Sequence, residues 1–168
     1  QLLSRIEDEN TGKILLEDLR VDTPDHRMQE IEELVSILGE DMVKEYPWKG
    51  STRPTTDDNI EAVLRRTWQP TLSVVGSDGL PPIENAGNVL RPYTVLKLSI
   101  RIPPMVDALR ARDAIHRALT ESVPYNADVT VEFEEPATGW SAPETAPWLV
   151  SAMNSASKRF YGKTAGVI

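Results

Sequence analysis

The strongest constraint on the fold is a stretch of alternating side chains that ends at two consecutive prolines. In Thr94–Ile102 the apolar residues at even positions alternate with a second set that includes Lys97 and Arg101. A period of two residues is that of a β-strand with one face on a core and the other partly in water, as is typical of antiparallel sheets. Pro103 and Pro104 cannot continue such a ladder. The stretch therefore predicts a strand of an antiparallel sheet.

The neighbouring segments predict the rest of this sheet and its helices. A second strand is expected over 71–75, ended by a turn at 76–79, and a third over 128–134, with a helix over 107–122 before it. Residues 1–6 have the spacing of the last turns of a helix. The order is that of a split β-α-β-β-α-β sandwich without its first strand. We therefore expect an α+β, ferredoxin-like antiparallel sheet with helices packed on one face and the first strand missing.

A mostly helical insertion is predicted over residues 10–65. Thr23 as N-cap and Pro24 at the first helical position open a helix with an apolar side, and Asp57 or Asp58 caps a shorter one after a loop at 47–56. The apolar positions of the two helices are Met28, Ile31, Leu34, Val35, Leu38 and Met42, followed by Ile60, Val63 and Leu64.

The two ends of the chain carry a further expectation about its organisation. Ser141 or Ala142 together with Pro143 is expected to open a last helix, so the sequence divides into a domain over 1–140 and a final segment over 141–168. No N-cap or methionine precedes Gln1, and residues 163–168 rise into a small apolar run and stop. We expect a polypeptide cut at both ends.

Composition excludes several classes of function. The chain has 18 Lys and Arg against 26 Asp and Glu, a formal charge of -8, which argues against binding to nucleic acid or to an anionic membrane. It has no cysteine, so disulfides and thiolate chemistry are excluded. No apolar run approaches the roughly 18 residues of a membrane span. A cytoplasmic protein is the expectation.

Residues with catalytic chemistry are few and isolated. His26 and His116 each lack a second ligand at metal-binding spacing, so we expect both to be surface residues of helices. Glu132, Glu134 and Glu135 lie where a carboxylate pair could act on zinc, but the first two alternate as the polar face of a strand. The sequence therefore predicts no catalytic residue and no metal ligand in this chain.

Arg101 has two possible roles on residue spacing alone. It lies on the wet face of the alternating strand and could offer its planar guanidinium to a carboxylate ligand. It could equally pair with Glu132 or Glu134 across the sheet. Spacing does not choose between them.

Three stretches carry a resemblance to a known family. They are Arg66–Gly76 with its Trp68-x-Pro70 step, Asn88–Pro92 and Lys97–Pro104. In this order they resemble the lid of the zinc exopeptidases called M-twenty metallopeptidases, which include carnosinase-like dipeptidases, acetylornithine deacetylase and succinyl-diaminopimelate desuccinylase. The insertion is similar to that of the dipeptidase branch, and Pro147-Trp-Leu with Phe160-Tyr-Gly162 is similar to the helix that returns to the catalytic domain.

The resemblance implies a role in binding, with the chemistry placed elsewhere. Family members hold two zinc ions in a catalytic domain and use a dimerising lid, so this chain would be the lid of a dipeptidase-like hydrolase and inactive alone. Arg101 matches the arginine that grips the substrate's carboxylate, and Asn88 matches a polar position that reaches the partner subunit's site. A small peptide or acyl-amino acid would be the substrate of a homodimer.

Two other functions remain open on the sequence. One is a stand-alone dimerising or regulatory module with no parent enzyme. The other is a ferredoxin-like module that binds a small ligand such as an amino acid, which would raise its melting temperature.

Overall fold

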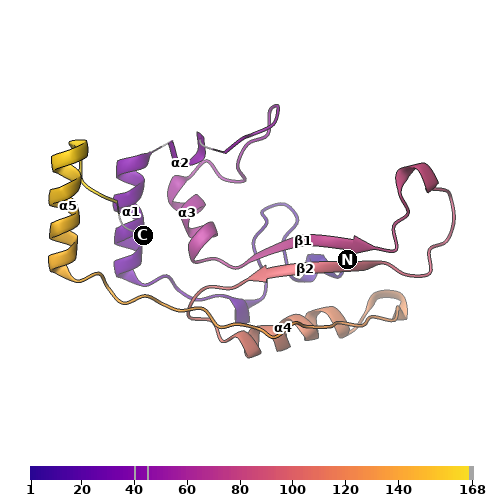
Figure 1. The fold of residues 1–168 in the computed structure, drawn as a ribbon. Helices are drawn as coiled ribbons and strands as arrows, with labels where there is room; N and C mark the ends of the chain where they lie inside the picture. Colours follow the sequence, from indigo (N-terminus) through magenta and orange to yellow (C-terminus); the bar gives the residue numbers. More distant parts are fainter. Residues whose placement is uncertain (40, 45, 167–168) are drawn as a thin grey trace.

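The α+β prediction is confirmed. The computed structural model describes residues 1–39, 41–44 and 46–166, which contain one antiparallel sheet with helices around it (Figure 1). The strands and α-helices are β1 (Thr71–Asp78), β2 (Val95–Arg101), α1 (Asp25–Leu38), α2 (Asp41–Lys44), α3 (Asn59–Thr67), α4 (Ala108–Thr120) and α5 (Pro147–Tyr161). Short 3-10 turns lie at Leu3–Arg5, Glu17–Leu19, Ile83–Asn85 and Pro124–Asn126.

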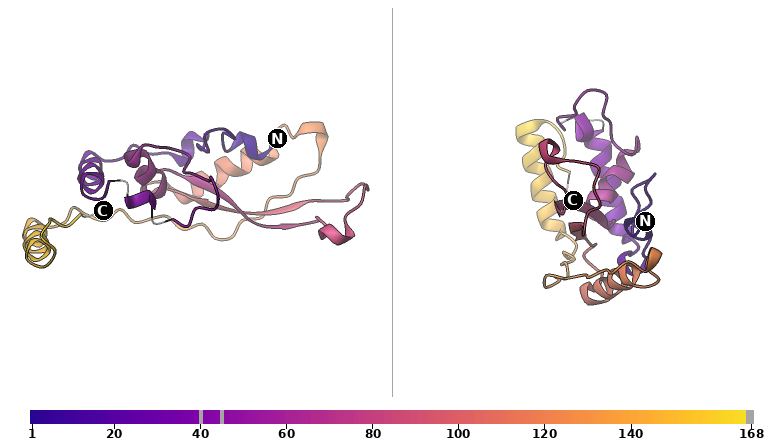
Figure 2. Two further views of the ribbon diagram at one scale, coloured as in Figure 1. Left: turned by 90° about the horizontal axis from the view of Figure 1, so that it is seen from above. Right: turned by 90° about the vertical axis from the view of Figure 1, so that its right-hand side faces the viewer.

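The elements spread out from the β1–β2 hairpin. Helices α1, α2 and α3 gather at one end of it, α4 runs alongside it, and α5 stands beyond α1 (Figure 1). The view from above shows the loop that joins β1 to β2 projecting away from α1, α3 and α5 (Figure 2, left). No helix of the described ranges is long and apolar enough to cross a membrane.

Strand β1 is longer than its sequence indicated. Its ladder with β2 runs from Thr71, opposite Arg101, to Asp78, opposite Val95, and the register shifts between Val74 and Gly76. The turn expected at 76–79 is therefore wrong. A β-bulge absorbs the extra residue, and the chain reverses only from Gly79, whose φ of +79° favours glycine.

The prediction of a third strand over 128–134 is also wrong, because this segment does not join the ladder of the sheet. This segment is extended, but in the described part of the chain it makes no backbone hydrogen bond with β2. Within the described ranges, the sheet consists of β1 and β2. Alternation of side chains indicates which of them face a core, as Val131 does here, but it does not supply a backbone partner.

Two apolar clusters form the core. The larger one joins the N-terminal segment to α4, and Leu72 of β1 and Ile100 of β2 pack against it. Its buried members are Ile6, Ile14, Leu19, Val106, Ala111, Ala114, Ile115 and Leu119. The smaller cluster joins α1 and α3 through Ile31, Val63 and Trp68. Val21 packs on both, so the predicted helical insertion is continuous with the sheet's core.

Side-chain caps begin two of the helices. Asp58 accepts hydrogen bonds from the backbone N–H groups of Ile60 and Glu61, and Asp107 does the same for Leu109 and Arg110. Asp58, one of the two residues expected to cap the short helix, is confirmed. The expected cap of the first long helix is wrong: α1 begins one residue later than predicted, and the structure shows no side-chain cap there.

The last helix begins later than its sequence indicated. Helix α5 starts at Pro147, with Ala146 at its N-cap, and not at Pro143. Pro147 has no N–H to donate to the carbonyl of Pro143, and it disfavours helical dihedrals at Ala146. A helix opened at Pro143 would therefore break at Pro147. Gly162, with a φ of +75°, ends α5 in the left-handed conformation.

The N-terminal segment, expected to be the end of a helix, packs against α4. Residues 1–6 form one 3-10 turn followed by Ile6, which is fully buried. The guanidinium of Arg5 donates to the carbonyls of Ala118, Glu121 and Ser122, so this segment is fixed to the C-terminal end of α4. Residues 167–168, the last of the apolar run at the other end, lie outside the described residues.

Candidate functional site

Arg101 lies at the inner end of the sheet, on the face turned away from the core. It is the last residue of β2 and is opposite Thr71 of β1. Ile100 and Ile102, its chain neighbours, pack against the larger core cluster, so alternation directs Arg101 to the other face. Arg101 is exposed, and its side chain has no hydrogen bond or ion pair with any residue that the structure describes. Its guanidinium therefore keeps all its N–H donors available.

Lys97 lies four residues before Arg101 on the same face of β2. It forms an ion pair with Glu134, one of the two glutamates with which Arg101 could have paired. Lys97 Nζ lies 2.8 Å from Glu134 Oε1. The hydrogen bond and charge of Lys97 lower the pKa of Glu134, and Glu134 in turn raises the pKa of Lys97. Glu132 has no ion pair in the described ranges. Pairing of Arg101 with either glutamate is thus not what the structure contains.

Asn88 lies at the opposite end of the hairpin. It belongs to the exposed loop between β1 and β2, beyond Val95, the first residue of β2. At about 3.3 Å per residue, β2 alone puts roughly 20 Å between Val95 and Arg101. One small molecule therefore cannot touch Asn88 and Arg101 of the same chain.

The two histidines lie apart and each has local contacts. His26 Nδ1 is 3.8 Å from Glu144 Oε1, and the ring of His116 on α4 lies 6.3 Å from that of Phe133. No group of three or more His, Cys, Asp or Glu side chains in the described residues could hold a metal ion. The residues of this part of the chain do not fit a two-zinc centre.

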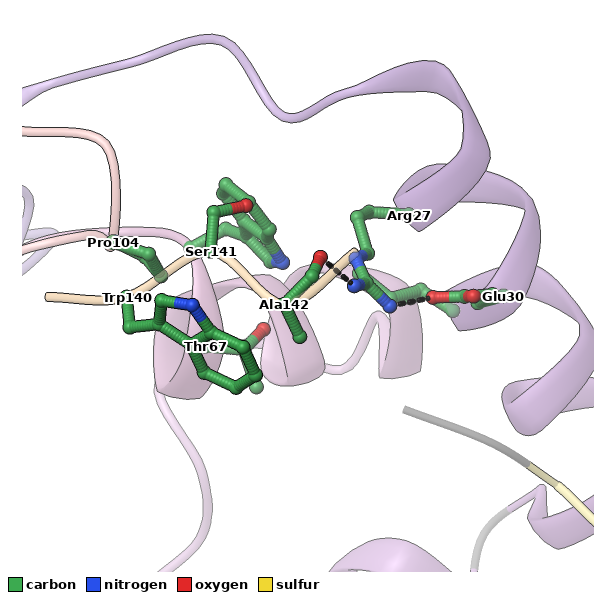
Figure 3. Close-up of a pocket in the computed structure, with 9 residues that line it drawn as sticks. Arg27, Glu30, Thr67, Pro104, Trp140, Ser141 and Ala142 are labelled. Atoms are coloured by element: carbon green, nitrogen blue, oxygen red, sulfur yellow. Dashed lines mark hydrogen bonds and ion pairs between the residues drawn. The ribbon is translucent and has the colours of Figure 1, made fainter. Parts of the chain in front are cut away.

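A pocket between α1, α3 and the segment that leads to α5 contains residues that the sequence did not single out. It has a volume of about 260 Å³ and is lined by Ile31, Trp68, Pro104, Trp140 and others (Figure 3). Gly139 lets the segment that leads to α5 pass close to the backbone of Pro104, because a Cβ at Gly139 would lie 2.8 Å from Pro104 Cα. The sequence held no signal for it, since residues 136–146 are far from α1 along the chain.

Arg27, which lines this pocket together with Glu30, is buried. Its guanidinium donates to Glu30 Oε2 at 2.5 Å and to the carbonyl of Ala142 at 2.7 Å, as the dashed lines in Figure 3 mark. Burial of a charge is costly unless it is paired and hydrogen-bonded, and both conditions are met. We interpret Arg27 as the tie between α1 and the segment that leads to α5.

The sequence matches no family model and no curated protein. Solved structures are similar in fold. Human carnosine dipeptidase 1 is 18% identical with a TM-score of 0.65, over 97% of this chain and 35% of that one. The dipeptidase Dug1p from Saccharomyces cerevisiae is 20% identical with a TM-score of 0.67, over 99% and 35%. The M20 family metallo-carboxypeptidase Sso-CP2 from Sulfolobus solfataricus is 20% identical with a TM-score of 0.60, over 99% and 37%.

These comparisons confirm the predicted resemblance as a likeness of fold. Each match covers nearly all of this chain. The chain spans about a third of the length of each of these structures. What the other two thirds of such a protein would do is therefore a matter for proposal.

Proposed function

We propose that this chain is the lid of a metal-dependent dipeptidase-like hydrolase and that it binds the substrate's free carboxylate. The observation that carries the proposal is Arg101, exposed and unpartnered among the described residues at the end of a strand, in a chain whose fold is that of part of such peptidases. In this proposal residues 1–140 form the lid, with 10–65 as its helical insertion, and 141–168 lead towards the catalytic domain.

Arg101 suits a carboxylate ligand in charge and shape. A guanidinium is planar, permanently charged and able to donate two parallel hydrogen bonds to a carboxylate. A strand residue next to the anchored Ile100 and Ile102 presents that fork from a fixed backbone. Gripping the free end of a short peptide would place the adjoining amide at a set distance from the reacting groups, which is how positioning accelerates a reaction.

The metal centre of the parent enzyme is assigned to the rest of the protein. The described residues offer no set of ligands for it, so we derive no catalytic step from this chain. A metal centre of that kind would polarise the scissile carbonyl and activate water. We predict that the isolated chain neither hydrolyses dipeptides nor binds zinc stoichiometrically.

Asn88 is proposed to serve the site of a second copy. Because Asn88 and Arg101 lie at opposite ends of the hairpin, two copies related by a two-fold axis could bring Asn88 of one copy to the substrate held by the other. The hairpin's outer end suits such an interface, since Ile83, Val89 and Leu90 around Asn88 are highly exposed apolar side chains. A homodimer is therefore part of the proposal.

The test uses the longer protein that contains this chain. Arg101→Met should raise KM for dipeptides by roughly 10- to 100-fold, as expected when a charge-assisted hydrogen bond is lost, and should leave C-terminally amidated dipeptides unaffected. Arg53→Met is the matched control, because Arg53 is exposed in the loop at 47–56 and pairs with no residue that the structure describes. Equal effects of Arg101→Met on free and amidated substrates would contradict the carboxylate role.

A further inference from the structure

Arg101 has a hydroxyl side chain directly opposite it in the sheet. Thr71 is its partner in the ladder, so the Cβ atoms of the two residues lie roughly 5 Å apart. Leu72 and Ile100, the neighbouring residues on the two strands, pack against the larger core cluster. Alternation therefore directs the hydroxyl of Thr71 and the guanidinium of Arg101 to the same face, away from that core.

The hydrogen-bond donors of both side chains are uncommitted in the part of the chain that the structure describes. The hydroxyl of Thr71, like the guanidinium of Arg101, makes no side-chain hydrogen bond there. Thr71 is also half-buried, so water reaches it from fewer directions than it reaches an exposed threonine. A guanidinium can only donate, and a hydroxyl can donate through its O–H group. The two residues therefore offer several N–H donors and one O–H donor to the same small region.

Buried prolines hold both backbones at this end of the hairpin, which adjoins α3 (Figure 1). Pro70 directly precedes Thr71, and Pro103 follows Arg101 by two residues; both prolines are buried. Proline fixes its own φ angle, and the branched side chain of threonine has a stiff χ1. Groups that are already held in place lose little conformational freedom when a ligand binds, which favours affinity.

We propose that Thr71 is a second carboxylate-binding residue, whose hydroxyl donates to the same carboxylate that Arg101 binds. This inference rests on the proposed function and adds a residue to its binding site. The two oxygens of a carboxylate have about four acceptor positions, so the two parallel N–H bonds of a guanidinium leave room for a further donor. A ligand that carries an uncharged amide in place of the carboxylate has one acceptor oxygen and cannot satisfy both residues.

The next pair of residues on the same face defines what lies beside the carboxylate. Ser73 is opposite Ser99, and both side chains are small and carry a hydroxyl. Lys97, the next residue of β2 on this face, is held in its ion pair with Glu134. At about 3.3 Å per residue, roughly 13 Å of strand separate Lys97 from Arg101. A short peptide bound by its carboxylate at Arg101 would therefore meet hydroxyl groups, and no bulky side chain, at this next pair.

Titration of the isotope-labelled chain with N-acetylglycine, followed by backbone amide shifts at low ionic strength, tests the pair. Thr71→Val keeps the branched shape of the side chain and removes the hydroxyl, and should raise Kd about fivefold. Arg101→Met removes the charge-assisted bonds and should raise Kd by roughly tenfold or more. Thr71→Ser keeps the hydroxyl, so its Kd should stay within about twofold of that of the unsubstituted chain.

Two controls separate the carboxylate contact from general effects. N-acetylglycinamide has the same shape as N-acetylglycine but no charge, and its weaker binding should be the same in Thr71→Val as in the unsubstituted chain. Thr94→Val is the matched substitution, because Thr94 is exposed and directly precedes β2, at the opposite end of the ladder from Arg101. It should leave the Kd for N-acetylglycine unchanged.

The outcomes distinguish this inference from the proposed function. An unchanged Kd in Thr71→Val with a raised Kd in Arg101→Met would overturn the inference and leave the carboxylate role of Arg101 standing. An unchanged Kd in both variants, or no saturable shift in the unsubstituted chain, would overturn the carboxylate site as a whole. A Kd raised as much in Thr71→Ser as in Thr71→Val would assign the effect to packing of the side chain, and would also overturn the role of the hydroxyl.

Discussion

Helices α4 and α5 are similar in length and opposite in packing. Helix α4 buries five residues (Ala108, Ala111, Ala114, Ile115 and Leu119), while no residue of α5 is buried. The apolar side chains of α5 are large and exposed: Trp148, Phe160 and Tyr161 are 72%, 73% and 80% accessible. Asp107 caps α4, whereas α5 has no side-chain cap.

The difference shows that an apolar stripe predicts a buried face but not the surface that buries it. Both sequences repeat apolar residues at helical spacing, yet only α4 finds its partner within the described chain. After α5 the chain returns to α1, where a Cβ on Gly166 would meet Leu34, and Asn154 accepts a bond from the N–H of Ala165. If the chain is part of a longer protein, as proposed above, the exposed apolar side of α5 is the surface on which the rest of that protein would pack.

The largest change in stability is expected when a buried side chain of α4 is shortened, which tests the difference in packing between α4 and α5. Ile115→Ala removes a buried side chain from the larger cluster and should lower the free energy of unfolding by about 3 kcal/mol, measured in urea. Leu149→Ala is the matched change in α5, where the side chain is 38% exposed, and should cost under about 1 kcal/mol. Similar losses of unfolding free energy in the two variants would contradict the difference in packing between α4 and α5.

A smaller effect is expected from the cap of α4. Asp107→Ala removes the acceptor of two backbone N–H bonds and should lower the free energy of unfolding by about 1 kcal/mol. Asp113→Ala is the control, since Asp113 is an exposed carboxylate of the same helix that caps nothing and pairs only with Arg112 in the described ranges. An equally large loss of unfolding free energy in Asp113→Ala would show that removal of a negative charge, and not loss of the cap, destabilises α4.

The smallest effect is expected at the start of α5. Trp148→Ala should change the free energy of unfolding of this chain by no more than about 0.5 kcal/mol, because the indole is largely in water. In a longer protein of the kind proposed above, the same substitution should lower Tm measurably. A marked loss of stability in the chain alone would show that Trp148 packs within it, and would overturn our interpretation of α5.

The sequence predicted the elements better than their connections. The strand at β2, the helix at α4 and the cap at Asp58 follow from local periodicity and local hydrogen bonding, and the structure has them. The bulge that extends β1 depends on an opposing strand. Residues 128–134 alternate like a strand but make no backbone hydrogen bond within the described ranges, because alternation does not specify a backbone partner.

The candidate site follows the same division. Alternation along β2 predicted that Arg101 faces away from the core, and the packing of Ile100 and Ile102 agrees. The sequence left open whether a glutamate would pair with Arg101, and the structure gives Glu134 to Lys97. Whether Lys97 or Arg101 pairs with Glu134 depends on how β2 and residues 128–134 lie relative to each other, and these segments are far apart in sequence. The roles of Arg101 and Asn88 stay predictions.

The bond between Arg27 and the carbonyl of Ala142 governs how mechanical load would travel through the chain. Tension applied at α5 passes along residues 143–146 and meets a buried, charge-assisted contact before it reaches the hairpin. That contact transfers the pull to α1, and through Ile31 to α3. A pull exerted at α5 would therefore reach α1 and α3 through this contact before it reached the hairpin.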